Sequence, residues 1–154
     1  MGSVHNLSIN VLSEDDFTDN GDGTVTDKRT GLMWVQSGYA DTDTTPATDY
    51  TIDGNWRKYT WENVILYCER LDFAGYTDWR LPNCKELYSI LSYEGTAPYI
   101  NETYFTNTKN HYYRTSTTYM TDTTYALLVN FNSGNMNSNS KTTVYYVRPV
   151  RGGV

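Results

Sequence analysis

Residues 74–83 read AGYTDWRLPN, and the elements on both sides can be placed from this stretch. An arginine stands between a tryptophan and a leucine, immediately ahead of a proline that leads into a helix. This pattern predicts a structural corner in which Trp79 packs in the interior and Arg80 pairs with carboxylates or carbonyls. Residues 148–151, RPVR, resemble the corner, and proline there limits pairing to an edge or a strand end.

A helix is expected directly after the corner. Asn83 can cap it, and Glu86 lies three residues later, as in a capping box. Gly95 should stop the chain from continuing as helix. The buried face should consist of Leu87, Ile90 and Leu91. The scaffold residues expected to be mostly buried are Trp61, Trp79, Leu81, Leu87 and Phe131.

An earlier helix is predicted from Thr60 to about Phe73, with Thr60 as N-cap and Gly75 as the C-terminal glycine. Its apolar stripe at helical spacing consists of Trp61, Val64, Ile65, Cys68 and Leu71. The only other cysteine is Cys84, and the pair is not spaced like a metal clip. A buried free thiol at Cys68 is therefore favoured over a disulfide.

Short strands are predicted ahead of this helix. Residues 24–26 and 32–34 read as two strands joined by a turn that closes at Gly31. Residues 1–16 are expected to form an N-terminal arm, either loose or as a single edge strand. Residues 37–55 are polar without periodicity and predict a long loop.

The stretch from Asp19 to Gly23 contains the oxygen ligands that suggest calcium. With Gly23 at position six of an EF-hand loop, the first and last ligand positions fall on Thr18 and Arg29. Neither suits that role, so a tight Asx-type turn is favoured.

The length, composition and charge of the sequence limit the classes of protein that it can belong to. A chain of 154 residues suits one domain with its own core, and two helices followed by a β-rich region predict an α+β fold. The net charge of −6 argues against a nucleic-acid partner. The sequence has no apolar run long enough to insert into a membrane, and from its first residues we expect no signal peptide.

Catalytic and metal-binding patterns are missing from the sequence. The two histidines, His5 and His111, lie far apart, and there is no Cys/His cluster. No nucleophile elbow and no phosphate-binding loop occur. We therefore expect no catalytic residue, no metal, no cofactor and no enzymatic activity.

Residues 110–146 have an unusual composition: six Asn, four Ser, eight Thr and six Tyr, with full charges only on Arg114, Asp122 and Lys141. A disordered polar tract is poor in aromatic residues, whereas binding loops favour Tyr, Ser and Asn. Within it, residues 125–131 form a strand-like run whose period of two puts Leu127 on the core face and Leu128 outside.

The segment therefore predicts a recognition surface with tyrosines as anchors and Asn, Ser and Thr as hydrogen-bonding contacts. The ligand expected for it is a protein on a target surface. The predicted contact residues are Tyr119, Asp122, Thr124, Tyr125, Leu128, Asn135, Asn137, Asn139, Thr143, Tyr145 and Tyr146.

The sequence resembles a bacterial and viral domain family named after the C-terminal domain of a collagen-like adhesin. The shared motifs run in order from about residue 17 to 153: NGDGTVTD (20–27), TGLMW (30–34), AGYTDWRLPN (74–83), KEL (85–87), TSTT (115–118), VNF (129–131) and YVRPVRGG (146–153). The resemblance implies a C-type lectin-like fold over residues 17–154, with a virion or cell-surface location and a place in a larger assembly.

The composition also resembles variable proteins of diversity-generating retroelements. Their domains vary where adenines of Asn codons are changed, which reaches Ser, Thr, Tyr, Asp and His but not Lys or Met. This resemblance implies a variable segment of about residues 112–146, with Met120, Met136 and Lys141 fixed.

Three alternatives stay open from sequence. A glycan-binding adhesin for sulfated sugars would need a basic cluster, but the segment has only Arg114 and Lys141. A structural virion or surface domain would use the Asn and Tyr residues only for solvation. The corner also resembles formylglycine-generating enzymes, but their C-terminal cysteine pair is missing, since no Cys follows Cys84.

Overall fold

The early strands form the hairpin that the sequence predicts. The computed structural model describes residues 12–38 and 50–153. The backbone N–H of Gly31 donates to the carbonyl of Asp27 at 2.8 Å, and a φ of 71° explains the glycine at that position. The four-stranded antiparallel sheet has the order β1-β2-β3-β9, with bounds Phe17–Asp19, Thr24–Asp27, Leu32–Val35 and Val150–Gly152. β9 lies at its edge, as Pro149 predicts.

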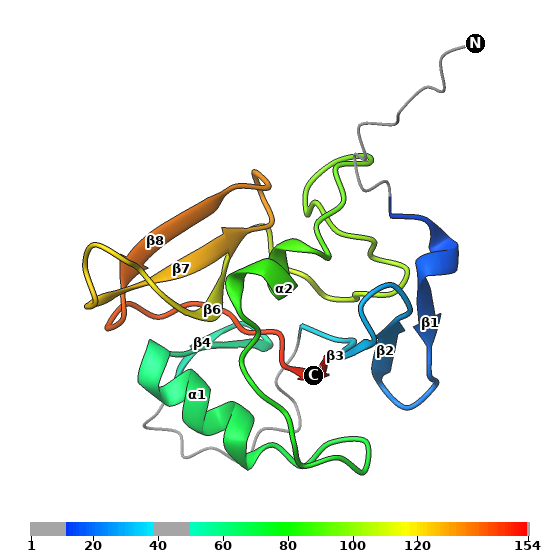
Figure 1. Cartoon of the computed structure of the whole chain (residues 1–154), viewed down its shortest axis with the longest axis horizontal. Coiled ribbons are helices and arrows are strands. Elements are labelled where there is room, and N and C mark those ends of the chain that lie inside the picture. The colour runs from blue at the N-terminus through cyan, green and yellow to red at the C-terminus, as the bar shows by residue number, and fades with distance from the viewer. Residues whose placement is uncertain (1–11, 39–49, 154) are drawn as a thin grey trace.

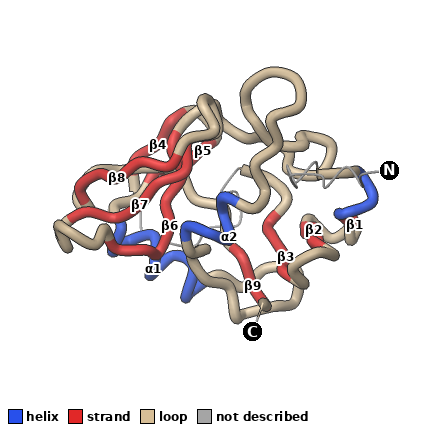
Figure 2. Tube along the Cα trace, turned by 45° about the horizontal axis from the view of Figure 1, so that its top comes forward, coloured by secondary structure: helices blue, strands red, loops and turns tan. Residues whose placement is uncertain are grey.

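Two further antiparallel sheets complete the β structure. One is the hairpin of β4 (Thr51–Asp53) and β5 (Trp56–Lys58), so part of the predicted loop 37–55 is a strand pair. Residues 39–49 of that loop lie outside the described part of the chain. The other is β6-β7-β8, with bounds Tyr112–Thr118, Tyr125–Asn130 and Met136–Ser140. In Figure 1 this sheet and the four-stranded one occupy opposite sides of the molecule, and Figure 2 shows the same separation.

Two α-helices form where the capping signals predict them. α1 (Trp61–Arg70) starts at Thr60, whose side chain accepts from the Asn63 N–H. α2 (Cys84–Tyr88) begins with the predicted capping box of Asn83 and Glu86. The predicted end of α1 is wrong by about one turn, because Leu71 turns extended and buries its side chain instead of continuing the helix toward Gly75.

The N-terminal region is partly described. Residues 1–11 of the predicted arm lie outside the described residues. Glu14–Asp16 form a short 3-10 helix, η1, rather than a loose arm or an edge strand. Leu12 ahead of it is buried in the core.

The corner at residues 79–82 forms as predicted. Trp79 is 2% exposed, and its indole N–H donates to the carbonyls of Phe73 (3.2 Å) and Tyr76 (3.1 Å). Arg80 makes a two-pronged pair with the Glu86 carboxylate, 2.7 Å for each N–O distance. The Arg80 guanidinium also donates to the Gly152 carbonyl at 2.8 Å, and thereby joins the corner to β9.

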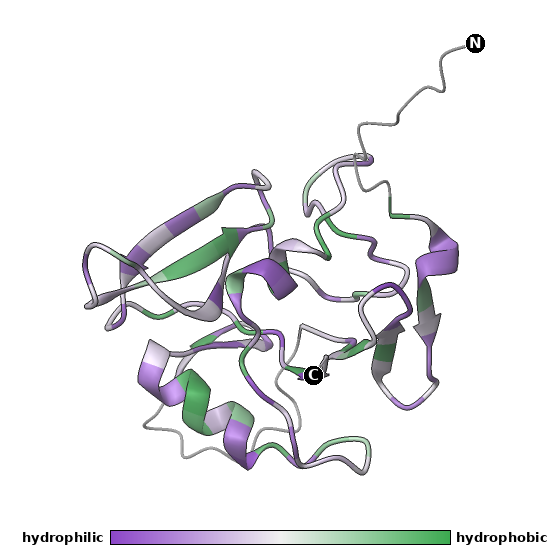
Figure 3. Cartoon of the chain, viewed as in Figure 1, coloured by the Kyte–Doolittle hydropathy of each residue, from purple (hydrophilic) through white to green (hydrophobic). Residues whose placement is uncertain are grey.

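The core has two parts that meet around the corner. One cluster joins the four-stranded sheet, α2 and the inner side of β6 and β7, and includes Trp34, Leu87 and Phe131. The other packs α1 against the corner and includes Trp79, Leu81 and Cys68, which is a free thiol, like the half-buried Cys84. Trp61 is only half-buried, and the other four predicted scaffold residues are buried. The apolar stripe of α1 and the apolar β7 stand out in Figure 3.

Candidate functional site

The predicted recognition segment folds as the sheet β6-β7-β8. One row across the three strands consists of Arg114, Leu128 and Asn137, and the next of Tyr113, Val129 and Met136. Because alternate residues point to opposite sides of a sheet, each row belongs to one face. The row with Tyr113 and Val129 faces the core beside α2.

The prediction that Leu128 points into solvent is wrong, since only 1% of it is exposed. Its neighbour in the row, Arg114, lies 4.9 Å from the Tyr145 ring centroid and donates to the carbonyls of Ser140 (2.8 Å) and Thr143. The chain after β8 thus closes over this face of the sheet. β7 is a central strand covered on both faces, so alternation does not identify an outer side.

Arg114 is a buried cation beneath this face. It has no exposed surface, and its Nε and Nη1 have no hydrogen-bond partner within the described chain. Burial lowers the pKa of Arg114 to about 10, which keeps the guanidinium charged at neutral pH. A positive charge therefore lies under the sheet without a carboxylate beside it in the described residues.

Two predicted contact residues, Tyr145 and Tyr146, are buried, with 7% and 4% exposed. Tyr145 is held by two backbone hydrogen bonds to Tyr59 (2.9 and 3.0 Å). The Tyr146 hydroxyl donates to the Asp53 carboxylate, and its ring packs 5.5 Å from that of Tyr113. Tyr146 is therefore a scaffold residue rather than a surface contact.

Tyr145 instead forms the floor of an aromatic cluster. The Asn139 amide donates to the Tyr145 hydroxyl at 2.7 Å, and the Asn137 amide donates to the Tyr112 hydroxyl at 2.8 Å. The two tyrosine rings lie 5.6 Å apart, and His111 packs on both, at 5.5 and 6.1 Å. We call these five residues the aromatic platform. His111 and Asn137 are its exposed members, while Tyr112 and Asn139 are half-buried.

A second exposed group lies at the turn between β6 and β7, residues 119–125, which we call the hairpin tip. Met120 is 91% exposed, and Tyr119 and Tyr125 are each more than a third exposed. Asp122 accepts hydrogen bonds from the Thr124 hydroxyl (2.6 Å) and N–H (3.0 Å), and these bonds lower the pKa of the Asp122 carboxyl. The tip is thus ordered while it presents apolar side chains to solvent.

Lys141 joins the hairpin tip to α1. Its ammonium lies 4.0 Å from the Trp61 ring centroid and donates to the Thr118 hydroxyl at 3.0 Å. A groove of about 610 Å³ opens beside it, lined by Thr60, Trp61, Glu62, Asn63, Lys141 and Thr142. Lys141 thereby covers part of a tryptophan that would otherwise be more exposed.

The structure therefore divides the predicted contact residues. Asn137, Asn139 and Tyr145 come together in the platform, and Tyr119, Asp122, Thr124 and Tyr125 in the hairpin tip. Asn135 and Thr143 are exposed in turns. Tyr112 and His111 were missed, although they lie in the same Tyr- and Asn-rich stretch and could have been added on composition. Lys58 and Lys109 flank His111. The sequence could not indicate this, because only the tertiary fold brings the two lysines to the site.

The Asp19–Gly23 stretch is a tight turn, as predicted. The Gly21 N–H donates to the Asp19 carboxylate at 2.9 Å, and the Thr24 N–H donates to that of Asp22 at 3.0 Å. Both carboxylates thus serve the turn itself. Among residues 12–38 and 50–153, no group of three His, Cys, Asp or Glu side chains is placed to hold a metal.

We expect the thermal stability of the domain to be independent of calcium. Ligands that bind the folded state raise stability by mass action, and the turn lacks the ligand set to do so. Melting curves with excess calcium and with EDTA should therefore superimpose. A melting temperature that falls with EDTA and recovers with calcium would show that the turn binds the ion.

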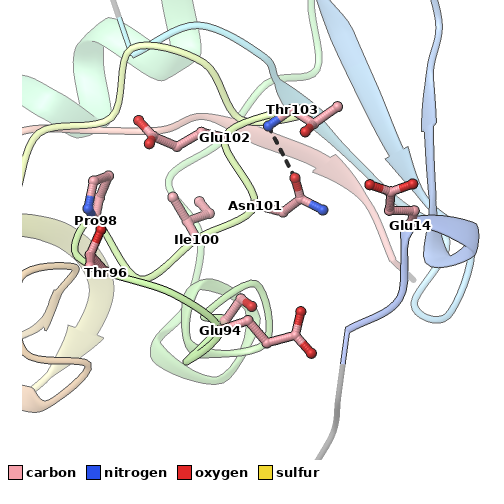
Figure 4. Close-up of a pocket in the computed structure, with 9 residues that line it drawn as sticks. Glu14, Glu94, Thr96, Pro98, Ile100, Asn101, Glu102 and Thr103 are labelled. Carbon is pink, nitrogen blue, oxygen red and sulfur yellow. Dashed lines mark hydrogen bonds between the residues drawn. The ribbon is translucent and has the colours of Figure 1, made fainter.

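A polar cavity of about 390 Å³ lies apart from these groups, between η1 and the loop 92–103. Figure 4 shows the carboxylates of Glu14, Glu94 and Glu102 around it, with Asn101 accepting from the Thr103 N–H at 3.0 Å. It contains none of the predicted contact residues.

The fold agrees with the family that the sequence motifs indicate. Residues 23–151 match the Lcl C-terminal domain family, and the chain belongs to it. The mixture of few helices with several antiparallel sheets agrees with the expected C-type lectin-like fold. Family membership identifies the chain as a surface-related, ligand-binding module.

No curated protein matches the chain. In the described segments, none of the helices has the length and apolar character needed to cross a bilayer.

Proposed function

We propose that this domain binds protein ligands on a target surface through β8, the hairpin tip and the aromatic platform. β8 carries the proposal. It is hydrogen-bonded along its length to β7, yet none of its side chains is buried. An ordered strand that adds nothing to the core is free to serve an external partner. The proposed role is binding on a virion or cell surface, without catalysis.

The proposal includes diversification of this face by a retroelement. Asn132, Asn135 and Asn137 are exposed, so replacing them would leave the core intact. Asn130 is the exception, because it is 9% exposed and its side chain accepts from the Asn132 N–H at 2.9 Å. The decisive observation is the neighbouring DNA. We expect a near-repeat of the coding region for residues 110–151 that differs only at adenines, next to a reverse-transcriptase gene.

Exchanging the exposed residues should leave stability nearly unchanged. We expect serine at Asn135, Asn137 and Tyr125 to shift the free energy of unfolding by about 0.5 kcal/mol or less each, because exposed positions contribute little. The matched control is Thr115→Val in the same segment. Thr115 is fully buried and its hydroxyl donates to the Leu127 carbonyl at 2.8 Å, so its loss should cost about 1–3 kcal/mol. Urea denaturation measures the free energy of unfolding of the serine variants and of Thr115→Val. If the serine variants lose as much stability as Thr115→Val, the exposed face is part of the scaffold.

Binding itself is tested with a display library randomised at the hairpin tip and β8. Selection on a purified soluble protein should yield specific binders, because Tyr- and Asn-rich faces on a rigid fold suit protein contacts. A control library randomised at Glu62 and Glu69 on the exposed side of α1 and at Asp72 just after the helix should yield none. Failure of the first library, or equal success of both, would contradict the proposed binding face.

A further inference from the structure

Two lysines from outside the recognition segment border the aromatic platform. Lys58 ends β5, and its ammonium lies 5.7 Å from the Tyr146 ring centroid. Lys109 lies 4.1 Å from the Trp56 ring centroid and 3.8 Å from the Asp53 carboxylate. Lys58 and Trp56 share one side of the β4–β5 hairpin with Asp53. This side contacts Tyr146, whose ring lies 5.6 Å from that of the platform residue His111.

The local charge is opposite in sign to that of the chain as a whole. Among the residues that the structure describes, three cations, Lys58, Lys109 and the buried Arg114, lie around the platform against the single carboxylate of Asp53. That carboxylate is already engaged by the Tyr146 hydroxyl and Lys109. Burial is the main cause that lowers the pKa of His111, and the positive charges of Lys58 and Lys109 lower it further. The Asp53 carboxylate acts in the opposite direction and raises that pKa. The imidazole thus lies in a net positive field, while the full chain carries −6.

The platform also presents unused hydrogen-bond donors. Each tyrosine hydroxyl accepts from an asparagine amide, Tyr112 from Asn137 and Tyr145 from Asn139. A phenol that accepts one bond still has its own proton to donate. Neither proton has an acceptor among the described residues. The two tyrosine rings pack on His111, and the two ammonium groups act on the same imidazole. Phenolic donors and positive charge around one side chain favour a ligand that accepts hydrogen bonds and carries negative charge.

We propose that the platform and its two lysines select a carboxylate-rich patch on the protein ligand. This inference rests on the proposed function and adds the chemistry of the partner. Because Lys58 and Lys109 lie outside residues 112–146, the contribution of their charge to this preference would persist whatever sequence the exposed face carries. The acidic chain as a whole disfavours an extended polyanion such as a nucleic acid, whereas a short acidic stretch on the platform meets its positive field.

The test uses a labelled decaglutamate peptide and fluorescence anisotropy. The peptide should bind weakly, and less as salt rises, because exposed charges are screened. Lys58→Gln and Lys109→Gln should each weaken binding by about threefold, the scale of one partly exposed charge pair. Lys85→Gln on α2, an exposed lysine away from the platform, should leave it unchanged. Circular dichroism confirms that all three variants are folded.

Tyr112→Phe tests the contribution of a phenolic hydrogen-bond donor separately from that of the lysine charges. It removes one phenolic proton and no charge, and it should weaken decaglutamate binding, while Tyr88→Phe, at an exposed tyrosine on α2, should not. The proposal is overturned if Lys85→Gln acts like Lys58→Gln, or if only a heparin fragment binds and the peptide does not. If the display library yields binders whose affinity depends neither on the acidity of the target protein nor on Lys58 and Lys109, this inference fails while the proposed function stands.

Discussion

Replacing Arg148 with methionine should lower the free energy of unfolding by about 3–5 kcal/mol, because several buried acceptors would lose a charged donor. Arg148 has no exposed surface. Its guanidinium donates to the carbonyls of Val35 (2.8 Å) and Gln36 and to the Thr108 hydroxyl at 2.7 Å. These partners come from the end of β3 and from the loop before β6, which the arginine holds together.

The matched control is Arg151→Met, three residues along. Arg151 pairs with the mostly exposed Asp78 at 2.6 Å, a surface ion pair worth about 1 kcal/mol or less. Urea denaturation of both variants at neutral pH compares a buried with an exposed arginine in one segment. Arg148→Lys should recover only part of the loss, since an ammonium does not reproduce the guanidinium fork. Equal losses at positions 148 and 151 would refute the assigned role of Arg148.

Replacing Trp79 with alanine should cost about 3–5 kcal/mol, the range for truncating an aromatic side chain in a core. The indole packs against Phe73 and Tyr76, at 6.1 and 6.4 Å between ring centroids, and its N–H serves both carbonyls. The loss would open a cavity and remove one of the two hydrogen bonds that each of those carbonyls accepts, leaving the backbone bonds between Phe73 and Tyr76. Trp79→Phe keeps most of the ring volume and should cost clearly less. If both variants unfold at the same urea concentration, packing is not the main contribution of Trp79.

Local signals made the scaffold predictable. The capping box at Asn83 and Glu86 and the turn at Gly31 depend on neighbours within a few residues, so the sequence contains the whole interaction. The corner was also predictable, because a tryptophan and a leucine beside a proline-led helix have few ways to pack. The end of α1 was not, because burial of Leu71 outweighed the glycine signal.

The site was predictable in composition but not in orientation. Alternation assigns one outer face to a strand, yet residues 126–129 are four consecutive apolar residues, which is also the pattern of a strand buried on both faces. That second interpretation is correct for Leu128. The lysines beside His111 come from β5 and from the loop before β6, and only the tertiary fold brings them together.

The pairing of β3 with β9 has a consequence for how the domain folds. Met33 and Arg151 are register partners, so the ladder joins residues that are 118 positions apart in the sequence. Such non-local contacts slow folding, because the chain loses conformational entropy before the contact forms and contributes stability. The residues between the two strands, including the exposed β8, form one long loop that the pairing of β3 with β9 closes. Closure entropy depends weakly on what that loop contains, so the same two strands can complete the fold around many different surfaces.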